Sequence, residues 1–157
     1  MLLRKAVWRQ LGGFDETLSH NEDYAFARRL QANKYQIAFA QNAIVLWHPR
    51  TTLKSFIVMI YRFAIGDAES GCYRPKVGLV FLRYLLAKVG VMLLALTSGA
   101  VLAGWVLLGM LLLYSCWAVL KNYRYAQNGW YWLPVLQYCA DGAVMVGTAI
   151  GLSRALI

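Results

Sequence analysis

The chain has 157 residues, of which 60% are hydrophobic, with a mean hydropathy of +0.48 and a formal net charge of +9. This length allows one ordinary domain, and the composition excludes a typical soluble one, because soluble domains hold about 45–50% apolar residues. Nucleic-acid binding is the weaker interpretation of the positive charge, and no nucleic acid is expected as a partner, since no module with base-stacking or groove-reading residues accompanies that charge.

Charge divides the chain into two parts. Six of the seven acidic residues and eleven of the sixteen basic residues precede position 77. Residues 1–76 therefore have the character of a water-facing unit, and residues 77–157 that of membrane-embedded helices. Basic residues crowd the approach to the first apolar span, where they meet anionic membrane lipids and hold that end inside. We expect an integral membrane protein, in a cell or inner membrane, with residues 1–76 facing the cytoplasm.

The water-facing part begins with two predicted helices. Residues Leu2–Leu11 can form a short helix that stops at Gly12 and Gly13, because glycine commonly ends helices. Cap-type residues at positions 19–21 then precede a second helix that runs to about Asn33.

Two adjacent acids, Glu22 and Asp23, open the second helix. Positions 23, 26, 27 and 30 follow helical spacing, so Asp23 is predicted to share the inward apolar stripe with Phe26 and Leu30, while Glu22 points elsewhere. One interpretation is that both acids simply favour the positive end of the helix dipole. The other is that an inward Asp23, kept ionised by the helix terminus, accepts a proton from a substrate hydroxyl.

Two β-favouring runs follow, YQIAF at 35–39 and AIVLW at 43–47, and they predict two strands or extended segments. A third helix is expected from about Leu53 to Ile65. Since this helix is apolar on most sides and too short to span a membrane, it is either sandwiched or lies on the bilayer surface.

The second part predicts two to three transmembrane helices, at about 77–96, 100–120 and 132–152. One straight span over the first 44 of these residues is excluded, because that helix would be about 66 Å long against a hydrocarbon core of about 30 Å. A break at Thr97–Gly99 makes a hairpin that returns Lys121 and Arg124 to the basic side. The rival arrangement, a surface helix up to Lys88 and one long tilted span, leaves those two bases outside.

Two charges fall near mid-depth in the hairpin arrangement, Lys88 and Asp141. An interhelical ion pair between them would offset the cost of burying each charge in hydrocarbon. Alternatively, Lys88 reaches towards the interface and Asp141 is protonated or meets other polar groups. Gly147 and Gly151 form a small-xxx-small face that would let another helix approach closely.

The segment LLRKAVWRQLGGFDETLSHNEDYAFARRLQANKYQIAFAQNAIVLWH resembles the C-terminal part of the catalytic domain of a family 2 glycosyltransferase, the inverting class with a nucleotide-diphosphosugar transferase fold. The matching elements are the Gly-Gly-Phe-Asp-Glu turn at 12–16, the acid pair that opens a helix containing Arg29-Leu30, the 35–39 run and a histidine after the second run. The resemblance covers about residues 1–70, and the helical tail is similar to that of membrane-anchored members.

The resemblance implies a role for each matching residue. Asp23 matches the general base that removes the proton of the acceptor hydroxyl, and Glu22 matches its partner in the acceptor site. Gly12, Gly13 and Asp15 match a substrate-binding turn at the floor of the active site. His48 matches a histidine that reaches a divalent metal, Mg or Mn, although a histidine packed at a strand end is an equal alternative.

The resemblance also implies an organisation. Residues 1–50 form the C-terminal part of a catalytic domain, 51–76 an interfacial helix and linker, and 77–157 a membrane domain. The fold class is thus an α/β fragment, the C-terminal half of a nucleotide-diphosphosugar transferase domain, followed by α-helical transmembrane segments. The chain has no room for the nucleotide-binding half that carries most metal ligands, and Asp67-Ala68-Glu69 lies in the wrong place to be its Asp-x-Asp motif.

We therefore expect a fragment, inactive alone, of an enzyme that moves a sugar from a nucleotide-sugar donor to a hydroxyl of a lipid or glycan acceptor. Its N-terminal half is expected either upstream in a longer protein or as a separate partner. The Gln-x-x-Arg-Trp signature of processive synthases is absent, which favours single addition. The alternatives are a small non-enzymatic membrane protein that scaffolds or binds a partner through its helices, and a transporter fragment built around Lys88 and Asp141.

Overall fold

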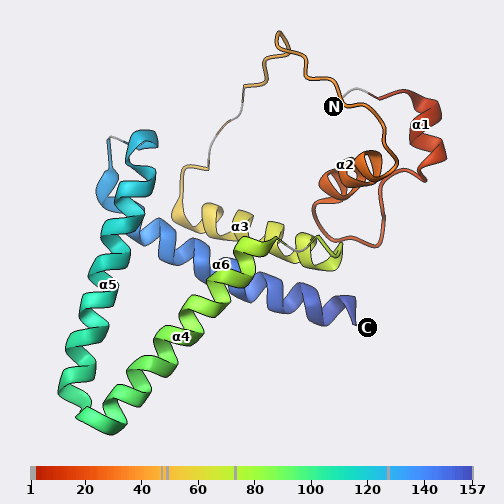
Figure 1. Ribbon diagram of the computed structural model, residues 1–157. Helices are drawn as coiled ribbons and strands as arrows, with labels where there is room; N and C mark the ends of the chain where they lie inside the picture. Colours follow the sequence, from red (N-terminus) through yellow and green to blue (C-terminus); the bar gives the residue numbers. More distant parts are fainter. Residues whose placement is uncertain (1–2, 47, 49, 73, 127, 157) are drawn as a thin grey trace. The chain divides into compact units, whose positions relative to one another are not determined.

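Figure 1 shows the computed structural model, which describes residues 3–46, 48, 50–72, 74–126 and 128–156. The chain forms two compact units. The first comprises Met1–Tyr73 with Val146–Ile157, and the second comprises Arg74–Met145. Each unit is described by itself below.

The expectation of an α/β fragment is wrong, because no strand occurs among the described residues and the regular structure there is helical throughout. The run at 35–39 is extended but unpaired, as are the described residues of the run at 43–47. Phe39 is 89% exposed and Leu46 is 85% exposed. A β-favouring sequence becomes a strand only through pairing and burial against neighbours. Among the described residues no strand lies beside either run, and nearly all their side chains are exposed.

The first unit contains three helices, α1 (Lys5–Gln10), α2 (Glu22–Ala32) and α3 (Leu53–Glu69). All three were expected at these places, and α3 continues four residues beyond its expected end. Thr52 caps α3, because its hydroxyl accepts a hydrogen bond from the Ser55 amide at 3.2 Å.

The last ten residues of α6 (Leu133–Ala155) also belong to the first unit, where they pack against α3 (Figure 1). A Cβ on Gly147 would lie 2.6 Å from the Tyr61 carbonyl oxygen, and one on Gly151 would lie 2.6 Å from that of Ile65. The facing positions on α3 are alanines, Ala64 and Ala68, both buried. The predicted small-xxx-small face is thus confirmed, and α3 is a sandwiched helix along this stretch.

The second unit is built on α4 (Pro75–Ser98) and α5 (Ala100–Asn122), with the first part of α6. Pro75 is the first residue of α4, where a missing N–H costs nothing. The two helices turn back at Gly99, whose φ of 93° is a conformation that favours glycine (Figure 1). The hairpin break expected at Thr97–Gly99 is confirmed.

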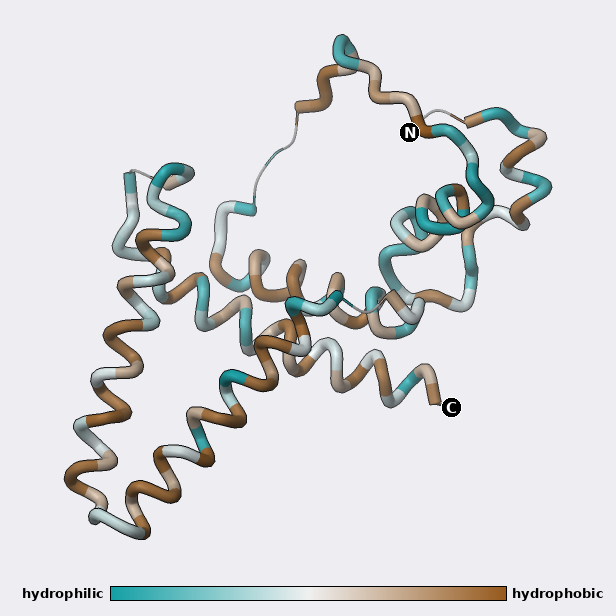
Figure 2. The backbone as a smooth tube through the Cα atoms, in the orientation of Figure 1, coloured by the Kyte–Doolittle hydropathy of each residue, from teal (hydrophilic) through white to brown (hydrophobic). Residues whose placement is uncertain are grey.

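Within the described residues, three helical stretches are long and apolar enough to cross a membrane, namely Pro75–Ser98, Ala100–Tyr125 and Trp130–Ala155. These match the three expected spans within a few residues. Large apolar side chains of α4 and α5 are exposed along their length, and Figure 2 shows both helices as hydrophobic almost throughout. Exposed apolar faces of this kind suit a lipid environment.

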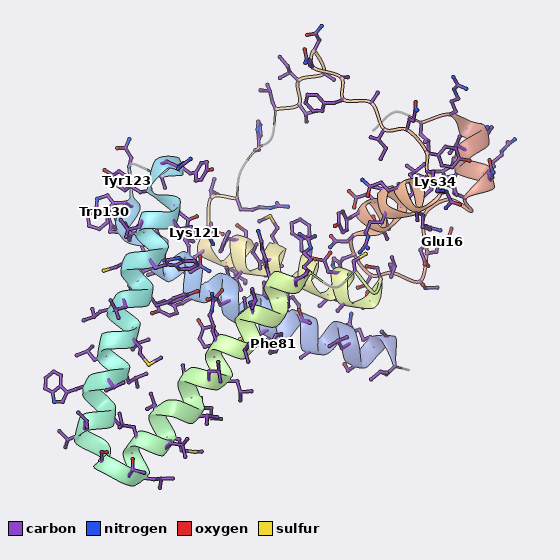
Figure 3. The ribbon with its side chains drawn as sticks, viewed as in Figure 1. Glu16, Lys34, Phe81, Lys121, Tyr123 and Trp130 are labelled. Carbon is purple, nitrogen blue, oxygen red and sulfur yellow. The ribbon has the colours of Figure 1, made fainter. Side chains whose placement is uncertain are left out.

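Two short 3-10 helices, η1 (Tyr123–Tyr125) and η2 (Trp130–Trp132), lie between α5 and α6. Figure 3 shows Lys121, Tyr123 and Trp130 at the end of α5 away from the turn at Gly99. Aromatic and basic side chains are enriched where a protein leaves the hydrocarbon core. This end of the second unit therefore has the composition of a membrane interface.

Candidate functional site

The Gly12-Gly13 turn follows α1 and requires glycine at both positions. Their φ angles are 75° and 71°, in the left-handed region. Gly13 is buried, and a Cβ there would lie 3.1 Å from the ring of Trp8. Gly12 is exposed, with nothing within 4 Å of the Cβ position. A ligand could therefore approach the backbone at Gly12 but not at Gly13.

Arg29 of α2 holds this turn in place. Its guanidinium donates hydrogen bonds to the carbonyl oxygens of Leu11 at 3.3 Å and Gly13 at 2.8 Å, and it lies 5.5 Å from the centre of the Phe26 ring. Sequence analysis missed this role. In the sequence, Arg29 is recognisable only as a basic residue in the last turn of α2. Its hydrogen-bond partners become known only from the fold.

An aromatic cluster joins α1, the turn and α2. Trp8 lies 4.4 Å from Phe14 and 4.9 Å from Phe26, between ring centroids, and the two phenylalanine rings meet edge to face at 5.6 Å. Phe26 is fully buried. Aromatic pairs in this geometry add stability beyond their buried area, so the turn and the start of α2 form one rigid assembly.

Asp15 stabilises the turn on its exposed side. Its Oδ1 accepts hydrogen bonds from the Thr17 hydroxyl at 2.6 Å and from the Thr17 amide at 3.1 Å. These two bonds lower the pKa of Asp15, so the side chain is a carboxylate at neutral pH. The observed contacts of Asp15 are those of a local turn, and its match to a substrate-binding position remains a prediction.

Glu22 and Asp23 occupy the first turn of α2, and both are exposed. Asp23 was expected on the inward stripe, but only Phe26 and Leu30 of that stripe are buried. The Asp23 side chain therefore lies outside the buried part of the stripe. Asp23 Oδ1 accepts a hydrogen bond from the Tyr24 amide at 2.7 Å, and no described residue donates to Oδ2.

The residue before these acids, Asn21, is anchored on α3. Its side-chain amide donates to the Phe63 carbonyl oxygen at 2.9 Å and to Asp67 Oδ1 at 3.1 Å, and its φ is 63°. The turn approaches α3 so closely that a Cβ on Gly66 would lie 2.3 Å from the His20 carbonyl oxygen. The leading edge of α2 is therefore fixed by α3.

Glu69, at the end of α3, completes this anchor. Its Oε2 accepts hydrogen bonds from the Ser19 amide at 3.0 Å and the Ser19 hydroxyl at 2.6 Å, and Oε1 pairs with Arg154 of α6 at 3.3 Å. Burial alone would raise the pKa of Glu69, but these partners outweigh it and lower the pKa. The Asp67-Ala68-Glu69 sequence, which is not a nucleotide-binding motif, thus serves to hold the α2 turn.

His48 is exposed in the extended segment before α3, and Trp47 and Pro49 on either side of it lie outside the described residues. Nowhere in the described ranges do three or more His, Cys, Asp or Glu side chains come together in a group that could hold a metal ion. The described residues by themselves therefore do not fit a divalent metal.

The second unit contains a separate polar cluster around Asp141, which is buried. Its Oδ2 accepts hydrogen bonds from Tyr114 at 2.6 Å and Tyr84 at 3.0 Å, and Oδ1 accepts one from Gln137 at 3.0 Å. The guanidinium of Arg83 forms an ion pair with Oδ2 of Asp141. The expected Lys88–Asp141 pair is not present, and Lys88 is exposed without a partner in the described part of the chain.

Comparison with known proteins identifies the family. The profile described as Glycosyl transferase family group 2 matches residues 1–144. The succinoglycan biosynthesis protein ExoA of Rhizobium meliloti (strain 1021) is 29% identical over 69 residues, which are 44% of this chain and 21% of that protein. The chain thus spans about a fifth of the length of this relative. No solved structure matches the chain. Since the family profile covers most of its length, the chain belongs to glycosyl transferase family group 2.

Proposed function

We propose that this chain is the acceptor-side and membrane part of an inverting glycosyltransferase, which transfers a sugar from a nucleotide-sugar donor to a hydroxyl of a lipid or glycan. The observation that carries the proposal is the exposed Glu22–Asp23 pair at the start of α2, fixed by the Asn21 anchor. The name of the relative assigns that protein to succinoglycan biosynthesis, which supports a glycan-type acceptor.

Asp23 is the proposed general base. One carboxylate oxygen is held by the Tyr24 amide, so the other is directed outward and can accept the proton of an acceptor hydroxyl. The acceptor oxygen then attacks the anomeric carbon as the bond to the nucleotide diphosphate breaks on the opposite face. Glu22 shapes the acceptor site, and the exposed backbone at Gly12 lets sugar or diphosphate approach.

In this proposal the nucleotide-sugar donor site is not formed by residues 1–157 alone. Nucleotide-sugar transfer with a divalent metal, Mg or Mn, needs carboxylate ligands that the described residues do not group together. His48 is the one ligand that this chain contributes in the proposal. The remaining ligands come from a further N-terminal part, in the same polypeptide or a separate one. Without that part, residues 1–157 do not transfer sugar.

The test is sugar transfer in membranes that contain the complete protein, with radiolabelled nucleotide sugars as donors. Asp23→Asn should lower kcat by about 10²–10⁴-fold, because a general base contributes that much, and should leave donor binding intact. Gln31→Ala, at an exposed position near the other end of α2, is the control and should retain activity. Undiminished turnover of the Asp23→Asn protein would exclude Asp23 as the base.

A further inference from the structure

A groove of about 880 Å³ lies between α4 and α5 in the second unit. Its long walls are aliphatic, formed by Val91, Met92 and Ala95 of α4 and by Leu107, Met110 and Leu111 of α5. From Arg83 to Ala95 the α4 wall extends for about 18 Å at 1.5 Å per residue. This length is close to one leaflet of a hydrocarbon core about 30 Å thick, so the groove fits an acyl chain.

The polar end of the groove is at Arg83, beside the Asp141 cluster. One terminal nitrogen of Arg83 forms the ion pair with Asp141, but Nε is buried and has no hydrogen-bond partner among the described residues. A buried N–H without an acceptor costs free energy that a bound acceptor would recover. Arg83 lines the groove and its side chain is 35% exposed, so an acceptor within the groove can contact the guanidinium there, and it reaches Nε once the neighbouring Tyr84 and Tyr114 rings shift.

A second cation, Lys88, stands on the same wall. It lies thirteen residues from Pro75, or about 20 Å along the helix, and is therefore within the hydrocarbon when α4 crosses a membrane. Lysine at this depth is unfavourable unless it meets an anion or water, and no described residue pairs with it. Asp141 cannot compensate Lys88, because its oxygens already contact Arg83, two tyrosines and Gln137.

We propose that the α4–α5 groove binds one anionic phospholipid, with an acyl chain along the aliphatic walls and its phosphate held by the Arg83 Nε–H and the Lys88 ammonium. The charge supports a lipid anion over a neutral helix as occupant, because a helix would leave both donors without an acceptor. Five residues, about 7.5 Å of helix, separate Arg83 from Lys88, and the flexible lysine stem lets its ammonium reach towards the level of Arg83. This site is independent of the proposed sugar transfer.

Native mass spectrometry tests the proposal on protein released from bilayers of phosphatidylcholine with phosphatidylglycerol as the probe. We expect one phosphatidylglycerol retained per chain in preference to phosphatidylcholine. Leu111→Trp fills the groove and should abolish retention. Leu112→Trp is the matched control, because Leu112 is the neighbouring leucine, is exposed and does not line the groove. If Leu111→Trp does not fold, Ala95→Phe narrows the groove from the other wall.

Lys88→Gln should reduce the preference for phosphatidylglycerol by about fivefold, the contribution of one lysine near anionic lipid. Lys76→Gln, at an exposed lysine outside the groove, should change it less. Equal retention of the two lipids by the wild type would overturn the proposal, as would equal retention of phosphatidylglycerol by the two tryptophan variants. A lipid-free dimer that Leu111→Trp dissociates would overturn it in favour of a second copy.

Discussion

Asn21 adopts a left-handed conformation immediately before the two acids of the candidate site. Its side-chain amide makes two hydrogen bonds to α3, so one residue sets both the backbone of the turn and its attachment. The position of Glu22 and Asp23 in space therefore depends on a residue that touches neither of them through its side chain.

We expect Asn21→Ala to lower the free energy of unfolding by about 1–3 kcal/mol, because it removes both hydrogen bonds and leaves the Asp67 carboxylate with one donor fewer. Asn21→Gly loses the same bonds but tolerates the left-handed backbone, and should cost about 1 kcal/mol less than alanine. Denaturant unfolding in detergent micelles measures both. Equal losses in the two variants would show that backbone conformation contributes nothing here.

The ionisation of Glu69 makes the stability of the fold depend on pH. Its pKa in the folded protein is below the ordinary value of 4.5, so ionised Glu69 stabilises the fold above that pH and this contribution disappears as the pH falls through the folded-state pKa. Glu69→Gln should lower stability at neutral pH and flatten the loss below about pH 4.5. Thermal unfolding measured from pH 7 to pH 3 tests this, and parallel curves for both proteins would contradict it.

At the scale of elements, α3 connects the candidate site to α6. One of its faces receives the His20-Asn21 turn at Gly66, and another packs on Gly147 and Gly151. Helices approach this closely only where small residues line both surfaces. Any displacement of α6 along α3 would thus be transmitted to the start of α2.

Gly151→Ala should separate α3 from α6, because its Cβ would lie 2.6 Å from a backbone oxygen that cannot move without shifting the helix. We expect a loss of about 1–3 kcal/mol, as for other overpacked sites. Gly142→Ala is the control on the same helix. Gly142 is exposed with open space around its Cβ position, so alanine should stabilise the helix slightly. Thermal unfolding that ranks these two variants equally would exclude a tight α3–α6 contact.

At the scale of the whole molecule, the candidate spans among the described residues and the distribution of basic residues predict a topology. Arg74 and Lys76 flank the start of α4, and Lys121 and Arg124 flank the end of α5, so we expect both hairpin ends on the cytoplasmic side with residues 1–73. The Gly99 turn is then expected on the opposite side.

Single cysteines introduced into a variant without the three native ones test this topology. A membrane-impermeant thiol reagent applied to intact cells should label Ser98→Cys, whereas Thr17→Cys and Asn128→Cys should be labelled only after the membrane is opened. The residues to be replaced, Thr17, Ser98 and Asn128, are all exposed. Labelling of Asn128→Cys from outside would mean that α5 does not return across the membrane.

Much of the helical structure is determined by the sequence alone. Apolar length, the Gly99 break and the glycines after α1 each act within a few residues, so their effects can be predicted without knowing the fold. Gly147 and Gly151 on α6 also predicted a close contact with another helix, but the sequence did not identify α3 as that helix. These predictions depend on local backbone preference and on the length that a membrane imposes.

Tertiary structure decided the rest. The runs at 35–39 and 43–47 have strand composition but no strand beside them, and Asp23 has the spacing of the buried stripe but lies beyond the edge of the core. Asp141 pairs with Arg83 rather than Lys88. In each case the outcome depends on which surfaces come together from distant parts of the chain, because pairing, burial and charge compensation are properties of the partner as much as of the residue itself.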